Sequence, residues 1–428
     1  MHEIDTPITR ACSAYAASSP ARFHMPGHKS RGGISPDDAL DLTELGATGS
    51  AMEGGDDVFS AAFREASALY GTSATVYSAG GATLALQGAI ALASRRVKRF
   101  ACFRAVHRSV INAFALLGID PVWISGPEEI PDNAAVVVTS PDYYGRMADI
   151  RRLSDVAHRR GGLLVVDCAH GAHLAFYGGG RLHPLRNGAD LAADSLHKTL
   201  PALTGSALLH AMGGVTAEEC LSAMRLFGST SPSYLINLST ERCLSLMSRE
   251  GEKLHAGLLA RLSEVRRRLS EMGFTALSSE PRDPFRLVLR MENARDIAAR
   301  LEDAGVIPEF ADSRHIVTIP SVMTSDSDLE RLLSALERLR DSVVRSPEPE
   351  DTDAAPPLRP EKAMTLRQAA LSPHVTVAAA RSAGMICGEA ATPYPPGVPA
   401  VMPGEIISRE AAELLVSSGV MTVSAVAK

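Results

Sequence analysis

The residue with the clearest chemical potential in this sequence is a lysine that directly follows a short hydrophobic stretch. It lies in Ser195-Leu-His-Lys-Thr199. A lysine amine that is desolvated and deprotonated at such a position can form an imine with an aldehyde cofactor. Ser195, three residues before Lys198, and His197, directly before it, could hold a phosphate beside that imine. A lone lysine after a strand is usually a solvated surface residue, so the motif needs support from elsewhere in the chain.

Asp167 ends a hydrophobic run in Val165-Val-Asp-Cys-Ala-His-Gly171. Ligands of open parallel sheets bind at the carboxyl ends of the strands, where this carboxylate is expected to lie. One interpretation is a turn or helix-capping aspartate. The other is a carboxylate that keeps a pyridinium nitrogen protonated, as beside bound pyridoxal phosphate.

Two further features precede Asp167 in the chain. A glycine-rich loop at residues 78–82 opens an Ala- and Leu-rich helix, and its backbone N–H groups could bind an anion. His107 could stack on an aromatic ring, or it could be a polar surface histidine. Each feature is weak by itself. Their order is an anion-binding loop, a histidine, a strand-end aspartate and a Ser-x-His-Lys run, which is the layout of fold type I pyridoxal-phosphate enzymes.

The hydrophobic pattern around these residues predicts an α/β fold. Residues 135–139 and 163–166 read as buried strands, and residues 147–160 between them have helical spacing. A strand, a helix and a strand in about thirty residues indicate a parallel sheet covered on both faces. Beyond it, a long amphipathic helix at 250–272 begins a smaller α+β module. The predicted organisation is an N-terminal segment (1–62), a large cofactor-binding α/β domain (63–240), a small α+β domain (241–345), an acidic Pro-rich linker (346–362) and a C-terminal domain (363–428).

Composition limits the class of protein. The 43 basic and 49 acidic residues give a net charge of −6 without a long basic run, so nucleic-acid binding is not expected. No apolar stretch approaches the roughly 20 residues of a membrane helix, and the polar N-terminus does not resemble a secretory signal. Six scattered cysteines without a CxxC pair favour reduced thiols and a cytoplasmic location. No metal site is expected.

Several longer motifs make a family resemblance specific. The sequence resembles the ornithine/lysine/arginine decarboxylase family, in its short form without the N-terminal wing domain. Phe-His-Met-Pro-Gly-His-Lys and Tyr-Pro-Pro-Gly are the family-specific pieces, whereas the aspartate and the lysine are shared with all fold type I enzymes. The matching stretches are Arg22-Phe-His-Met-Pro-Gly-His-Lys29, Asp41-Leu-Thr-Glu44, Ser140-Pro-Asp-Tyr-Tyr-Gly145, Asp167-Cys-Ala-His-Gly-Ala-His173, Gly188-Ala-Asp190, His197-Lys-Thr-Leu200, Leu203-Thr204, Ser229-Thr-Ser-Pro-Ser-Tyr234, Tyr394-Pro-Pro-Gly397 and Pro403-Gly-Glu405.

The resemblance implies an aspartate aminotransferase-like large domain and pyridoxal 5'-phosphate as the cofactor. The implied reaction is decarboxylation of a basic L-amino acid, arginine before lysine or ornithine, to the amine and CO2. Lys198 would form the Schiff base, Asp167 would hold the ring nitrogen and His107 would stack on the ring, and with His197 these are the predicted catalytic residues. The implied cofactor-binding residues are Ser78, Ala79, Gly80, Gly81, Ala82, His107, Asp167, Ala169, His170, Ser195, His197 and Lys198.

The family also implies a homodimer, or a multiple of dimers, with the site at the interface, where residues 229–231 would reach the partner's cofactor. A nearby acid must return a proton to the substrate's α-carbon, and His197 and Lys198 are both candidates. A cationic substrate side chain needs an acidic receiver. The candidates for that receiver are Glu44, Asp56, Asp57 and Glu405.

Three departures from the family pattern put the substrate in question more than the cofactor. The phosphate loop has Ala79-Gly-Gly81 in place of a hydroxyl-bearing Asn-Gly-Thr-Ser type sequence, Cys168 replaces the usual Glu, and residues 51–57 differ from the usual Leu-Asp-Asp-Leu-His type segment. The alternatives are an aminotransferase, a decarboxylase of a different amino acid, or a non-catalytic homologue that regulates a true decarboxylase. The absence of an evident arginine motif for a substrate carboxylate disfavours transamination, and the intact Lys198 and Asp167 disfavour the regulator.

Overall fold

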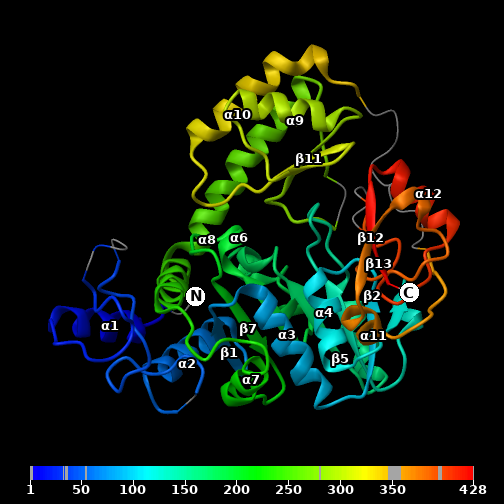
Figure 1. Cartoon of the computed structure of the whole chain (residues 1–428). Coiled ribbons are helices and arrows are strands. Elements are labelled where there is room, and N and C mark those ends of the chain that lie inside the picture. The colour runs from blue at the N-terminus through cyan, green and yellow to red at the C-terminus, as the bar shows by residue number, and fades with distance from the viewer. Residues whose placement is uncertain are drawn as a thin grey trace. The chain divides into compact units, whose positions relative to one another are not determined.

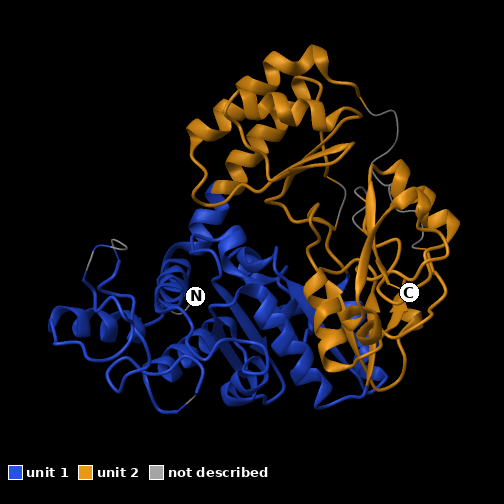
Figure 2. Ribbon diagram, viewed as in Figure 1, with its two compact units in different colours: residues 1–98, 149–257 blue, residues 99–148, 258–428 orange. Residues whose placement is uncertain are grey.

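The computed structural model describes residues 3–31, 33, 37–53, 55–278, 281–345, 358–393 and 398–427. The chain forms two compact units, each made of two stretches of sequence: residues 1–98 with 149–257, and residues 99–148 with 258–428. They are coloured separately in Figure 2 and are called unit 1 and unit 2. Most of the predicted linker, residues 346–357, and the Tyr394–Gly397 motif lie outside the described residues.

Unit 1 carries one part of the central sheet and the helices that cover it (Figure 1). Its strands are short and buried along their whole length or nearly so, as expected for a sheet covered on both faces. The elements are α1 (Pro7–Ala17), α2 (Val58–Tyr70), β1 (Ala74–Ser78), α3 (Gly81–Ser94), α5 (Ile150–Arg159), β5 (Leu163–Cys168), β6 (Leu191–Ser195), α6 (Leu196–Thr199), β7 (Ala207–Ala211), α7 (Ala217–Met224) and the first part of α8 (Tyr234–Glu271).

The strand order in unit 1 is β1-β7-β6-β5. β5 and β6 pair in parallel, whereas β7 is antiparallel to both of its neighbours, β1 and β6. The carboxyl ends of β1, β5 and β6 therefore lie at the same edge of the sheet. The residues that follow these three strands are the predicted phosphate loop, Asp167 with its neighbours, and the Lys198 motif.

Unit 2 combines three parallel strands with two small antiparallel sheets. The parallel strands are in the order β4-β2-β3, and the two antiparallel sheets are ordered β10-β11-β9-β8 and β12-β13. The elements are β2 (Arg99–Phe103), α4 (Arg108–Leu117), β3 (Val122–Ile124), β4 (Ala134–Thr139), the end of α8, β8 (Thr275–Ala276), β9 (Leu287–Arg290), α9 (Ala294–Asp303), β10 (Phe310–Ala311), β11 (His315–Thr318), α10 (Asp326–Leu339), α11 (Leu366–Leu371), β12 (His374–Ala378), α12 (Arg409–Ser417) and β13 (Thr422–Val426).

The predicted α/β fold with a mainly parallel sheet and smaller α+β parts is confirmed. Helix α8 begins at Tyr234, well before the predicted start at residue 250, and so the predicted domain boundary at 240 falls inside this helix. The Tyr234 ring packs edge-on against Phe59 at a centroid distance of 5.4 Å, and its hydroxyl donates to the carbonyl of Gly49. This anchoring to distant parts of unit 1 is not visible in the local sequence pattern. All six cysteines are buried, and none of them is in a disulfide bond within the described residues.

Candidate active site

The end of β5 presents Asp167 in a fixed orientation. The carboxylate is almost completely buried, with 3% of the residue exposed, and its Oδ1 accepts a hydrogen bond from the N–H of Ala169 at 3.2 Å. This aspartate turn is one of the two local interpretations that the sequence allowed. His170 follows it and is also buried. Asp167 and His170 are the candidate-site residues at and after the end of β5.

The second element of the candidate site is the short helix α6, which directly follows β6. The Leu196 N–H donates to Ser206 O at 3.0 Å, and this contact holds the helix against the chain before β7. Lys198 is half-buried, and its Nζ lies 3.2 Å from Nε2 of His170. His197 is half-buried, and burial together with the neighbouring Lys198 charge lowers the pKa of its imidazole. The predicted lysine is therefore in contact with His170, which follows Asp167 by three residues.

The predicted phosphate loop lies at the same edge, between β1 and α3. Ser78 Oγ donates to the carbonyl of Gly81 at 2.9 Å, so this hydroxyl is used inside the loop. Gly81 has a φ of +68°, which favours glycine, and its N–H donates to Gly205 O at 2.9 Å. The N–H groups of Ala82 and Thr83 have no hydrogen-bond partner among the residues that the structure describes. They are the free donors expected at a helix N-terminus, where an anion can bind.

The sheet register brings this loop and the lysine motif together. Ser78 at the end of β1 and Ser195 at the end of β6 both pair with Ala207 of β7. Since neighbouring strands lie about 4.8 Å apart, the two serines are roughly 10 Å from each other across one strand. Ser195 is 1% exposed, and its Oγ has no hydrogen-bond partner within the described part of the chain. An unpartnered buried hydroxyl at this edge is a donor that a bound group could use.

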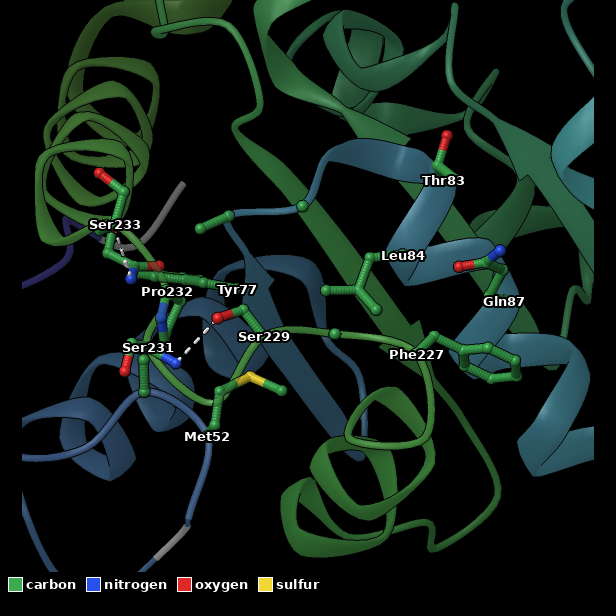
Figure 3. A pocket seen from close by; sticks show the side chains of 15 residues that line it. Met52, Tyr77, Thr83, Leu84, Gln87, Phe227, Ser229, Ser231, Pro232 and Ser233 are labelled. Carbon is green, nitrogen blue, oxygen red and sulfur yellow. Dashed lines mark hydrogen bonds between the residues drawn. The ribbon is translucent and has the colours of Figure 1, made fainter.

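A cavity of about 390 Å³ opens beside the loop (Figure 3). Ala79, Gly80 and Thr83 line one side, and Ser229 and Ser231 line another. In Figure 3 the Ser229 side chain points towards the Ser231 backbone, whose N–H donates to Ser229 Oγ at 3.1 Å. The predicted interface segment 229–231 therefore borders the phosphate loop within one chain.

Unit 2 contains His107. It caps the N-terminus of α4, with Nδ1 accepting the N–H of Ser109 at 3.2 Å, and the residue is exposed on unit 2. Glu405 is also in unit 2, where its carboxylate forms a buried two-point ion pair with Arg104. Glu405 was a candidate from the sequence, but Arg104 was not predicted as a site residue, and the pairing of the two cannot be read from local sequence spacing.

The other predicted acids differ in the number of hydrogen bonds and ion pairs that their carboxylates form. Asp57 caps α2 by accepting the N–H groups of Phe59 and Ser60, each at 3.0 Å, and it also accepts that of Ser50. Asp56 is exposed, with a weak contact of 3.8 Å to Arg64. Glu44 is half-buried. Its Oε2 accepts from Thr43, and its buried Oε1 has no partner among the described residues.

A buried polar cluster behind the strand ends was not predicted. Asp194 Oδ2 lies 3.1 Å from His183 Nε2 and 3.2 Å from His210 Nε2, and all three side chains are essentially inaccessible. The Cys168 sulfur lies 3.7 Å from the same His183 nitrogen. Asp194 lies in the apolar sequence of β6, directly before Ser195. An aspartate at such a position was the one sequence feature that could have indicated a buried polar cluster.

Comparisons with known proteins assign the family. A model of the Orn/Lys/Arg decarboxylase major domain matches residues 127–281, and a model of that family's C-terminal domain matches residues 351–417. Together these ranges cover more than half of the chain. The chain belongs to the Orn/Lys/Arg decarboxylase family. It is an amino-acid decarboxylase of the pyridoxal-phosphate-dependent class, as the resemblance implied.

Relatives support this assignment over nearly the whole length. The arginine decarboxylase of Bacillus subtilis (strain 168) is 26% identical over 462 residues, covering 96% of this chain and 93% of the relative. The arginine decarboxylase of Halalkalibacterium halodurans is 26% identical over 452 residues, covering 94% of this chain and 91% of the relative.

Solved structures share the fold. A lysine decarboxylase from Francisella novicida superposes with a TM-score of 0.81 at 16% identity, covering 99% of this chain and 82% of that one. Lysine decarboxylase A from Pseudomonas aeruginosa superposes with a TM-score of 0.82 at 17% identity, covering 98% of this chain and 80% of that one. The helices of the described residues include none that is long and apolar enough to cross a membrane.

The residues at the edge of unit 1 fit the cofactor of this family. Its phosphate requires donors, which the free N–H groups of the α3 N-terminus and the unpartnered Ser195 hydroxyl provide. Its ring nitrogen requires an acidic partner, for which Asp167 is buried and fixed by its turn. Its aldehyde requires an amine, and Lys198 follows β6, which lies between β1 and β5 in the strand order.

Proposed function

We propose that this family member decarboxylates arginine to agmatine and CO2, with Lys198 as the lysine that binds pyridoxal phosphate. The observation that carries the proposal is the contact of 3.2 Å between Lys198 Nζ and Nε2 of His170, which follows the buried Asp167 by three residues. The arginine preference rests on relatives that bear the name arginine decarboxylase and cover nearly all of this chain. Lysine and ornithine are the next candidates.

When bound, the cofactor supplies an electron sink for the pair left by the departing carboxylate. The chain's own residues supply the rest. Asp167 would hold the proton on the ring nitrogen, and the Ser195 hydroxyl with the α3 N-terminus would bind the phosphate. His107 stacking on the ring and His170 with Ala169 beside it remain proposals from the family resemblance. His197, whose lowered pKa favours the neutral imidazole, and Lys198 remain the two candidates for returning a proton to the α-carbon.

Glu44 is the acid we favour as the receiver of the substrate guanidinium. Its buried, unpartnered oxygen distinguishes it from Asp57 and Glu405, whose carboxylates are engaged by the N-terminus of α2 and by Arg104. A guanidinium would give that oxygen a charge-assisted hydrogen bond. We further propose a cytoplasmic homodimer, or a multiple of dimers, in which residues 229–231 reach the partner's site.

The test is to purify the protein with added pyridoxal phosphate and compare two lysine variants. The wild type should be yellow, and Lys198→Ala should lose both the visible absorption band and CO2 release. Lys253→Ala, at an exposed position of α8, is the matched control and should retain both. A colourless wild type that takes up no cofactor would contradict the proposal that Lys198 binds pyridoxal phosphate.

The substrate is tested by incubating the wild type with arginine, lysine, ornithine and uncharged amino acids. Arginine should give the highest kcat/KM for CO2 release. Formation of an oxo acid in place of CO2 would indicate an aminotransferase and would overturn the proposal.

A further inference from the structure

A buried ion pair joins the end of β2 to the C-terminal segment, here the described residues 358–393 and 398–427. The guanidinium of Arg104 donates from both terminal nitrogens to the two oxygens of Glu405, each at 2.8 Å. The side chains are 3% and 6% exposed. Arg104 also donates to the carbonyls of Pro399 and Ala400, both at 3.4 Å, and lies 5.7 Å from the Trp123 ring centre. Such a planar two-point pair fixes orientation as well as distance.

The C-terminal segment holds Glu405 rigidly. Oε2 of Glu405 accepts the Met402 N–H at 2.7 Å, and its backbone N–H donates to the carbonyl of the same residue at 3.1 Å. The Glu405 carbonyl accepts the Cys387 N–H at 2.9 Å. The flanking residues Val401 and Ile407 belong to the core of this segment. The carboxylate is therefore a fixed anchor, and Arg104 is the side chain that it orients.

Arg104 lies three residues before His107, and the intervening chain is constrained. The Val106 N–H donates to the Arg104 carbonyl at 2.9 Å, and His107 then caps α4. The opposite end of α4 is held by the same C-terminal segment, since Arg367 donates to the carbonyl of Leu116 at 2.6 Å. The C-terminal segment thus contacts Arg104, four residues before α4 begins, and the carbonyl of Leu116 in the last turn of α4.

We propose that Arg104 and Glu405 are positioning residues that fix His107 for its role beside the cofactor. The inference rests on the proposed function, because the placement of His107 matters for catalysis only if the cofactor binds there. It gives Glu405 a role in place of substrate binding. It also gives the C-terminal segment a function in the reaction. Glu405 of that segment fixes Arg104, and Arg104 in turn fixes the chain that leads to His107.

The experiment compares Glu405→Gln with Arg359→Gln, using the full-length protein. Arg359 is a matched control because it also links the C-terminal segment to the β2–β4 region, through Glu129 at 2.6 Å, but its side chain is 62% exposed. Hydrogen exchange of the peptide spanning residues 104–110 should accelerate at least about tenfold in Glu405→Gln and stay unchanged in the control. Arg104→Lys, which keeps the charge but not the two-point geometry, should give the same direction of change.

Catalytic coupling is read from a double-mutant cycle with His107→Ala. If the pair acts through His107, Glu405→Gln should lower kcat/KM and alter the visible circular dichroism of the bound cofactor, and it should add little to His107→Ala. Fully multiplicative losses, or unchanged exchange at residues 104–110, would overturn the inference. A wild type that binds no cofactor would contradict the proposed function instead, and the exchange measurement would still decide whether the pair orders the His107 turn.

Discussion

Lys198 Nζ and His170 Nε2 lie 3.2 Å apart, although 28 residues separate them in the chain. Two basic groups can share a hydrogen bond only if at least one of them is unprotonated, because an ammonium and an imidazolium are both donors. The contact therefore couples the protonation of the lysine to that of the histidine. A neutral amine is the form that attacks the aldehyde of the cofactor.

The first prediction concerns His170. We expect His170→Ala to slow the capture of pyridoxal phosphate by the apoprotein about tenfold, and His170→Gln to slow it less because glutamine can still form a hydrogen bond. Both variants should change the pH dependence of cofactor capture, because the histidine no longer shares a proton with Lys198. Stopped-flow measurement of the visible band over a range of pH values tests this. His158→Gln, at an exposed histidine paired with Asp190, is the control, and an identical pH profile in all variants would refute the coupling.

The second prediction concerns the unpartnered hydroxyl of Ser195. We expect Ser195→Ala to weaken cofactor binding about tenfold, while the apoprotein keeps its stability or gains up to about 1 kcal/mol because an unsatisfied buried group is removed. Ser154→Ala is the opposite control, since Ser154 Oγ donates to Gly188 O at 2.8 Å. That variant should lose about 1 kcal/mol of stability with unchanged cofactor affinity. Cofactor titration and urea unfolding give both quantities, and a destabilised Ser195→Ala apoprotein would contradict the interpretation.

Local patterns predicted the elements whose residues are buried on both faces. The strand predicted at 135–139 is β4, one residue longer, and the strand predicted at 163–166 extends to Cys168 as β5. β6 is the short strand expected before Lys198, but no bounds were predicted for it, because Asp194 and Ser195 interrupt its short run of Leu and Ala. The apolar pattern of this strand is weak because it carries part of the candidate site.

Relationships between distant residues were beyond local patterns. In sequence, Glu44, Asp57 and Glu405 are all ordinary acids. In the fold, Glu44 is a half-buried carboxylate and Asp57 is a helix cap. Glu405 is the partner of Arg104, from which it is separated by 301 positions in the sequence. The family resemblance supplied the order of the motifs but not these partners, since hydrogen bonding and burial depend on the packed structure.

The third prediction distinguishes Glu44 among these acids. We expect Glu44→Gln to raise the KM for arginine about tenfold or more, because the guanidinium would lose a charge-assisted partner. The visible band of the bound cofactor should stay unchanged. Asp56→Asn, at an exposed acid, should leave both properties as in the wild type. Steady-state CO2 release over a range of arginine concentrations measures the effect, and an unaltered KM would remove Glu44 as the receiver.

The last prediction concerns stability and pH at the buried Asp194 cluster. Burial alone would raise the pKa of Asp194, but the His183 and His210 imidazoles hold it well below its usual range. Burial lowers the pKa of His210, and this outweighs the opposing effect of Asp194. A histidine whose pKa is lower in the folded state favours unfolding once it protonates. The free energy of unfolding should therefore be highest above about pH 6.5 and fall as the pH drops through and below that value, by about 1.4 kcal/mol for each unit of pKa difference.

The Asp194 carboxylate contributes in a lower window. Its stabilisation is present above the unfolded pKa of about 3.9 and is lost only as the pH falls below that value. Between pH 5 and 8 the slope should thus come from histidine, and His210→Gln should flatten it while also lowering stability, because glutamine replaces one of the two imidazole partners of Asp194. Urea unfolding at several pH values, with His158→Gln as the exposed control, measures this. An unchanged slope in His210→Gln would mean that other titrating groups set the acid sensitivity of the fold.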